Sequence, residues 1–255
     1  MSGHNKWSTI KHKKGAADAK RGKIFSRVSK EIIMAAKEGG ADPALNARLR
    51  SAIAAAKAAN MPNDNVDRAI KKGAGGGDGT VMETLSYEGY AAGGVAVIVN
   101  CLSDNRNRTA ADIRSFFNKY NCSLGASGSV SWKFHRKAKF VIEGEAADEE
   151  KLFEILLDGG VDVEDISVDE DYAEIIAPPE AFGAVLEALE KAGITATESS
   201  IALIPENLTE VTDVNVAKSV QKFIEVLEDY DDAQEVYTDM DISDEVAEAL
   251  AAEED

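Results

Sequence analysis

The 255-residue chain is poor in the residues that most catalytic and metal centres require. Its only cysteines are Cys101 and Cys122, and its only histidines are His4, His12 and His135. Neither set has the spacing of zinc ligands, so we expect no metal site. The sequence also lacks a Gly-x-Ser-x-Gly elbow and a phosphate-binding loop that ends in Gly-Lys-Ser/Thr. These absences favour a protein that is not an enzyme and that needs no cofactor.

Long apolar runs are absent too. No stretch of about 18 apolar residues is present, and the start of the chain lacks the apolar segment of a signal peptide. We therefore expect a cytoplasmic protein that does not bind membranes and whose two thiols are reduced, with a disulfide between them as the alternative. Aromatic residues make up only 6% of the chain, so its cores must be mainly aliphatic.

Charge is divided unevenly along the chain. The formal net charge is −18, which by itself argues against a nucleic-acid partner. Residues 1–72, however, hold sixteen Lys or Arg and six Asp or Glu, a net charge of +10, whereas the remainder has a net charge of −28. A basic end on an acidic body indicates either a surface that faces nucleic acid or a basic domain that docks on its own acidic half.

The basic segment is predicted to begin with an extended arm and to continue as a small bundle of three helices. Residues 2–15 show no helical period. Apolar residues then recur every three to four positions from Ile24 to Ala36, which is the pattern of an amphipathic helix.

Two further helices and a linker are expected to complete this segment. Asp42 followed by Pro43 predicts the start of a helix over 43–60, because Asp caps helices and proline suits their first position. Asn63 is expected to cap a third, shorter helix. The glycine-rich stretch 73–79 predicts a flexible linker.

From Met82 onward the apolar period changes to two, which indicates strands. The expected elements are strands over 82–90, 94–102 and 128–134, a helix over 109–120, and, much later, a helix over 213–229 and a strand over 234–238. Between these two groups lies a run in the order βαββαβ, with strands over 138–143, 161–168, 172–177 and 194–204 and helices over 147–158 and 179–192. That order is typical of the ferredoxin-like arrangement.

The fold class predicted from these patterns is α+β. We expect an N-terminal three-helix domain with its arm and linker over 1–80, and an α/β domain built from 81–134 plus 206–240. The ferredoxin-like βαββαβ domain, 135–205, is inserted in that second domain, because the late helix and strand have no partners nearby in sequence. Residues 241–255 are an acidic tail.

The arm and the first helix carry the first candidate binding site. Its cations are dense enough to follow a phosphate backbone, where each neutralised phosphate releases condensed counterions. The candidate residues are Lys6, Trp7, Lys11, His12, Lys13, Lys14, Lys20, Arg21, Lys23 and Arg27. Trp7 offers a flat ring on which a base can stack. The alternative is that Trp7 anchors the arm on the bundle and that the lysines only keep the protein soluble.

A second candidate site lies between a predicted strand and a predicted helix, at Asn105, Arg106, Asn107 and Arg108. Asp104 or Asn107 is expected to cap the helix, whose exposed amides favour anions. Two arginines beside them supply forked donors that suit phosphate. The alternative is an ordinary turn whose arginines pair with the acidic body.

Several motifs together resemble the YebC/PmpR family. They are Gly3-His4-Asn5-Lys6-Trp7, the run from Asp18 to Phe25, Tyr87-Glu88-Gly89, the run from Ser103 to Thr109, Leu124-Gly125 and Gly128-Ser129-Val130. The likeness extends to about residue 240. It implies three domains, one helical and two α/β, and a role in the control of gene expression.

The resemblance leaves two kinds of nucleic-acid partner. Bacterial members of the family are associated with DNA-binding transcriptional regulation, so DNA is the first expectation. Relatives that activate translation in mitochondria or relieve stalled ribosomes make ribosomal RNA, and with it the ribosome, the alternative. The helix predicted over 43–60 is rich in alanine and has few groups that read base edges, so phosphate contact and recognition of shape fit better.

Overall fold

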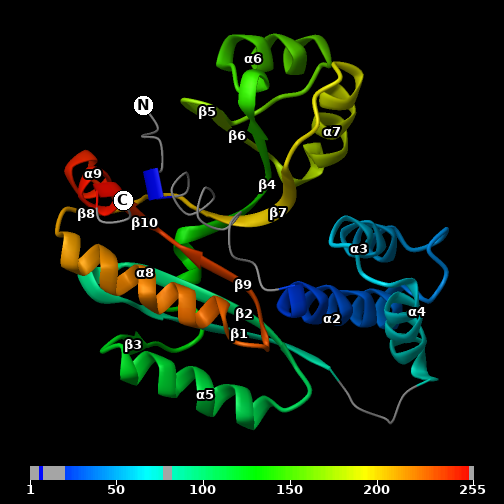
Figure 1. Cartoon of the computed structure of the whole chain (residues 1–255), viewed down its shortest axis with the longest axis horizontal. Helices are drawn as coiled ribbons and strands as arrows, with labels where there is room; N and C mark the ends of the chain where they lie inside the picture. Colours follow the sequence, from blue (N-terminus) through cyan, green and yellow to red (C-terminus); the bar gives the residue numbers. More distant parts are fainter. Residues whose placement is uncertain (1–5, 8–20, 77–81, 253–255) are drawn as a thin grey trace. The chain divides into compact units, whose positions relative to one another are not determined.

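The computed structural model describes residues 6–7, 21–76 and 82–252 (Figure 1). It divides into two compact units. One comprises 14–129 and 218–236, and the other comprises 1–13, 130–217 and 237–255. The structure is mixed helix and sheet, with a helical region followed by two four-stranded sheets, as the sequence predicts. The three domain boundaries expected at residues 80, 134 and 205 stay a prediction.

Three helices form the helical region: α2 (Arg21–Gly39), α3 (Ala47–Ala58) and α4 (Asn63–Lys71). Their apolar faces share one core, with Ile32, Leu49 and Ala56 almost completely buried. Asn46 connects the first two helices. Its side chain caps α3 by accepting from the Leu49 amide at 3.0 Å, and it donates to the carbonyl of Ala35 in α2 at 2.7 Å.

Both expected caps in this region are wrong. Asn46, not Asp42, caps the second helix, since only the later residue reaches the first free amides of α3 and the carbonyls at the end of α2. Asn63 lies inside α4, and Pro62 precedes it without a side-chain cap.

The expected flexible linker over 73–79 is wrong for its described residues, 73–76. Lys72–Gly76 form a π-helical turn that packs on α2. Gly73 makes the close approach possible, because a Cβ there would lie 2.3 Å from the Ile33 carbonyl oxygen. Residues 77–79 lie outside the described part of the chain.

The first sheet has the strand order β3-β1-β2-β9. Its strands are β1 (Glu83–Tyr90), β2 (Ala96–Ser103), β3 (Ser123–Leu124) and β9 (Ala233–Thr238), with helices α5 (Arg106–Lys119) and α8 (Val214–Glu228). Phe117 of α5 and Phe223 of α8 meet edge to face with 4.9 Å between ring centroids. The late strand therefore joins the early ones in one sheet, as the sequence predicts.

The second sheet has the order β5-β6-β4-β7, and its neighbouring strands are antiparallel. Its elements are β4 (Phe134–Glu143), α6 (Glu149–Asp158), β5 (Asp165–Asp169), β6 (Tyr172–Ala177), α7 (Phe182–Lys191) and β7 (Glu198–Pro205). Both helices pack on one face of this sheet through Leu152, Leu156, Val185 and Leu189 (Figure 1). This is the predicted ferredoxin-like βαββαβ arrangement.

One predicted strand is replaced by other structure. The stretch 128–134 contains a turn at Gly128 with a φ of +87°, and then a 3₁₀ turn over Ser131–Lys133. The neighbouring strand β4 is longer than expected and begins at Phe134. A positive φ at Gly128 is incompatible with an extended strand, so no strand runs from residue 128 into β4.

The chain ends in a small sheet and a helix. Strand β8 (Thr209–Val211) pairs in parallel with β10 (Met240–Ile242), and α9 (Asp244–Ala252) follows within the acidic tail. In the three described ranges, no helix is both long and apolar enough to cross a membrane. Cys101 and Cys122 are free thiols.

Candidate nucleic-acid interface

The second candidate segment lies where β2 ends and α5 begins. Asn105 caps α5, and its side-chain oxygen accepts from the Arg108 amide at 3.1 Å. The Asn105 amide in turn donates to the Ser103 hydroxyl at 3.0 Å. The expected caps, Asp104 and Asn107, are therefore wrong, because the extended backbone at Asn105 (φ −143°, ψ 90°) places that residue at the capping position.

The guanidinium of Arg108 forms ion pairs with two carboxylates of the same chain. Its Nη2 lies 2.8 Å from the Asp232 carboxylate and 3.0 Å from the Asp104 carboxylate. The hydrogen bond to Asp232 raises the pKa of Arg108, although partial burial works the other way. The side chain nevertheless stays 47% exposed, so solvent reaches the guanidinium from outside.

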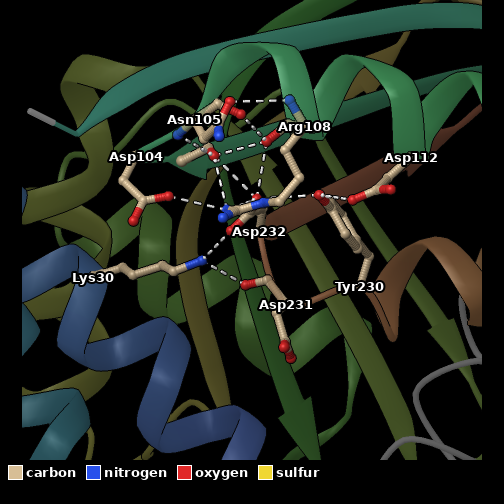
Figure 2. A network of polar contacts seen from close by, with 10 residues as sticks. Lys30, Asp104, Asn105, Arg108, Asp112, Tyr230, Asp231 and Asp232 are labelled. Atoms are coloured by element: carbon tan, nitrogen blue, oxygen red, sulfur yellow. Dashed lines mark hydrogen bonds and ion pairs between the residues drawn. The ribbon is translucent and has the colours of Figure 1, made fainter.

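The Asp232 network joins segments that are far apart in sequence (Figure 2). Lys30 of α2 donates to the Asp232 carboxylate at 2.8 Å. The hydroxyls of Ser103, Thr109 and Tyr230 lie 3.0, 2.9 and 3.1 Å from the other carboxylate oxygen, the one that Arg108 also contacts. One carboxylate, 7% exposed, thus receives two cations and three hydroxyls.

The cations and hydroxyl donors around Asp232 favour the ionised form of its carboxyl group. Burial by itself raises the pKa of the carboxyl group, but hydrogen bonds from Lys30, Arg108 and Thr109 together outweigh it. The pKa of Asp232 is therefore held well below its usual range. Tyr230 shows the opposite shift, since burial and the nearby carboxylates of Asp112 and Asp232 raise the pKa of its hydroxyl.

Arg106 and Asn107 lie in the same turn, at the start of α5. Both are exposed, and neither side chain has a hydrogen-bond or ion-pair partner among the described residues. Arg106 lines a cleft of about 560 Å³ together with Tyr87 of β1, Ala110 of α5 and Ser127. The cleft also touches Glu83, Thr84, Leu85 and Ser86 of β1. A cation and an aromatic ring thus share one open hollow.

In the first candidate segment and just after it, two cations of α2, Arg27 and Lys30, contact the connection between α8 and β9. Arg27 donates to the carbonyl of Glu228, and Lys30 donates to the carbonyl of Asp231 at 2.7 Å as well as to Asp232. The alternative stated for the basic segment, docking on acidic residues of the same chain, therefore holds for these two side chains. Arg21 and Lys23 belong to α2, and their side chains are outside the description.

The arm is described at two of its candidate residues. Lys6 forms an ion pair with Asp244, and Trp7 is only 4% exposed. In this conformation the indole is not available for stacking on a base. The described contacts of Lys6 and Trp7 are with Asp241 of β10 and Asp244 of α9, and not with the three-helix bundle on which the alternative places Trp7. The other candidates, Lys11, His12, Lys13, Lys14 and Lys20, lie outside the described residues. Their contact with nucleic acid stays a prediction.

Helix α3 offers little for reading bases. Arg48 pairs with Glu31 and Glu38 of α2, and these contacts raise its pKa, with the hydrogen bond to Glu31 the largest cause. Arg50 donates to the carbonyls of Pro43 and Ala44. Both arginines of the helix are thus occupied by their own chain.

Sequence reasoning missed Lys30, Tyr230 and Asp232. Lys30 and Asp232 are 202 positions apart, and no local spacing connects them. Asp232 also stands in an acidic stretch where one carboxylate cannot be told from the next by pattern. Within the described ranges, no group of three or more His, Cys, Asp or Glu is placed to hold a metal ion.

The fold defines the class of protein: an α+β chain in which a helical region precedes two four-stranded sheets. Family models describe the same two parts. The model of the TACO1/YebC N-terminal domain matches residues 5–76, and the model of the TACO1/YebC second and third domain matches residues 82–240. The chain belongs to the TACO1/YebC family, as its motifs suggest.

Named relatives agree with this membership. The chain is 50% identical over 251 residues to a probable transcriptional regulatory protein of Desulfotalea psychrophila, covering 98% of this chain and all of the relative. It is 51% identical over 250 residues to a protein of the same name from Geobacter sulfurreducens, with the same coverage. A conserved hypothetical protein from Aquifex aeolicus has a similar crystal structure, with a TM-score of 0.80 and 43% identity, over 89% of this chain and 93% of that one. The names of the relatives point to a regulatory protein rather than an enzyme.

Proposed function

We propose that this chain is a non-enzymatic, nucleic-acid-binding regulator of gene expression, with DNA as its first target. The names of its relatives support a regulatory role in transcription. The observation that carries the proposal is the first turn of α5, where Arg106 and Asn107 are exposed beside the cleft that contains Tyr87.

The chemistry of this turn suits a phosphate backbone. The amides at the start of a helix attract anions, and the forked guanidinium of Arg106 matches a phosphate group. The half-buried ring of Tyr87 supplies a surface against which a sugar or an unstacked base can pack. Side chains of Arg108 and Asn105 would support this surface indirectly, since both are engaged within the chain.

One observation favours ribosomal RNA as the second candidate target. The arginines of α3 are occupied by Glu31, Glu38 and two backbone carbonyls, so this helix has little with which to read a major groove. A protein that contacts phosphates and recognises shape suits structured RNA as well as DNA. In that case the ribosome is the partner, and translation is the step that is regulated.

Binding of labelled duplex DNA and of a structured ribosomal RNA fragment tests the proposal. Arg106→Ala combined with Asn107→Ala should weaken binding of the preferred nucleic acid by about tenfold, the order of one lost charged contact. Arg114→Ala is the matched control, because it removes an exposed cation of the same helix outside the cleft. Equal effects of both changes, or no binding to either nucleic acid, would contradict the proposal.

The choice between DNA and RNA needs a separate experiment. Crosslinking in living cells, followed by sequencing of the attached nucleic acid, should recover genomic DNA at discrete sites if the first target is correct. Recovery of ribosomal RNA instead would make translation the regulated step.

A further inference from the structure

The Asp232 carboxylate has an unusual set of partners for a residue in the connection between a helix and a strand. The connection between α8 and β9 is acidic, and it reads Glu228-Asp229-Tyr230-Asp231-Asp232. Within it, backbone and side chains together bind three cations: Arg27, Lys30 and Arg108. Two of these three, Arg27 and Arg108, are residues that the sequence predicts to bind phosphate.

The arrangement around Asp232 resembles that around a bound phosphate. Phosphate oxygens are bound in proteins by lysine and arginine and by hydroxyl donors, and these are the groups that surround the Asp232 carboxylate (Figure 2). A carboxylate presents oxygen acceptors of the same charge sign in the same place. The side chain therefore competes directly with any phosphate that approaches these donors.

A phosphate can compete with Asp232 only for those donors that are accessible to solvent. Arg108 is 47% exposed, so a phosphate reaches its guanidinium without any movement of the backbone. Lys30 is 16% exposed and becomes accessible only when the α8–β9 connection moves away. Arg106 lies two residues before Arg108, at the turn where the proposed function places nucleic acid.

From this geometry we infer that Asp232 is an autoinhibitory contact. Its carboxylate pairs with both Lys30 and Arg108 and so competes for these two cations with nucleic-acid phosphates at the start of α5. Displacement of the Asp232 carboxylate by a phosphate removes its ion pairs with Lys30 and Arg108 and adds both cations to the interface. This inference rests on the proposed function and names its regulation.

The central experiment compares Asp232→Asn with the unmodified chain. Asparagine keeps the size and an oxygen acceptor but removes the charge. In about 50 mM salt the variant should bind the nucleic acid roughly tenfold more tightly, and the slope of log K against log salt should be steeper by about one to two. Unchanged or weaker binding by a folded variant, with an unchanged slope, would overturn the inference.

A matched control separates this contact from a general loss of negative charge. Asp104→Asn also removes a carboxylate that contacts Arg108, at 3.0 Å, but Asp104 is 44% exposed and does not contact Lys30. Its effect on affinity should therefore be less than about threefold, the scale of an exposed ion pair. An effect as large as that of Asp232→Asn would also count against the inference.

The effect of inorganic phosphate on the melting temperature tests the inference even if the protein does not bind nucleic acid. Inorganic phosphate should raise the melting temperature of Asp232→Asn more than that of the unmodified chain, because Asp232 competes with phosphate for the same donors; this comparison does not depend on nucleic-acid binding. Absence of a phosphate effect would contradict the autoinhibitory contact, whereas absence of nucleic-acid binding by the unmodified chain would contradict only the proposed function.

If Asp232→Asn does not fold, Lys30→Met with Asp232→Asn removes both charges of that pair. Compared with Lys30→Met alone, the double variant should show a salt slope steeper by about one, because it frees Arg108. An unchanged slope would overturn the inference.

Discussion

At the scale of single residues, we expect the free energy of unfolding to depend strongly on the ionisation of Asp232. Its carboxylate accepts hydrogen bonds from five side chains, and its pKa is lowered in the folded protein. A carboxyl group whose pKa is lowered by folding stabilises the fold fully at a pH above its ordinary pKa, about 3.9 for Asp. This contribution is lost as the pH falls from that value through the lower pKa of the folded protein.

The predicted result is a pH-dependent cost of Asp232→Asn. Near pH 7 the variant should lose about 1–3 kcal/mol in its free energy of unfolding, since charge-assisted hydrogen bonds are replaced by neutral ones. This difference from the unmodified chain should shrink at acidic pH, where Asp232 itself becomes protonated. Urea unfolding at several pH values measures it. A difference that stays constant from neutral to strongly acidic pH would contradict the assigned charge.

Trp7 provides a second residue-scale prediction. Because its side chain is 4% exposed, Trp7→Ala should lower the free energy of unfolding by about 3 kcal/mol, the range for loss of a large buried side chain. Nucleic-acid affinity should change little. Melting curves and binding titrations of the same variant decide the question. A variant with normal melting and weakened binding would restore Trp7 as a stacking residue.

The residue scale also shows the limits of sequence reasoning about the site. The pattern Asn105-Arg106-Asn107-Arg108 is local, so its position between a strand and a helix could be predicted. That Arg108 is paired internally and Arg106 is not depends on Asp232, which lies 124 positions away from Arg108. No local pattern contains that distinction.

At the scale of elements, periodicity predicted helices and strands where one face is buried; β2, by contrast, is buried along almost its whole length. The end of α4 was harder to predict. Glycine usually stops a helix, yet Gly73 continues into a π-helical turn because its missing side chain allows close packing on α2. Caps were difficult for a related reason: Asp42, Asn46 and Asn63 all suit the position, and tertiary contact with α2 selects Asn46.

Gly73→Ala should therefore destabilise the helical region. The new methyl group would lie 2.3 Å from the Ile33 carbonyl oxygen and 2.8 Å from the Ala36 Cβ, so the packing must shift at a cost of about 1–3 kcal/mol. Gly183→Ala in α7 is the control, because nothing lies within 4 Å of its new Cβ. Thermal unfolding should show a lower melting temperature for Gly73→Ala and an unchanged melting temperature for Gly183→Ala. Equal melting temperatures would argue against the close approach of α2.

At the scale of the whole molecule, the charge division along the sequence has two consequences. Some cations of the basic segment are held by acidic residues of the same chain, as Lys30 is by Asp232. Others, among them Lys57, Lys71 and Lys72, are exposed and have no partner in the part of the chain that the structure describes. Composition alone predicted both alternatives, and it could not divide the cations between them, because that division depends on tertiary contacts.

The most direct test of the account is the salt dependence of nucleic-acid binding by the full chain. If six to ten phosphates are contacted, affinity should fall by about 10³–10⁵ between roughly 50 and 200 mM salt. Deletion of residues 1–14, or the combined change of Lys11, Lys13 and Lys14 to Ala, should reduce both the affinity and the slope. A flat salt response, or an arm deletion that leaves affinity unchanged, would contradict binding through the basic segment.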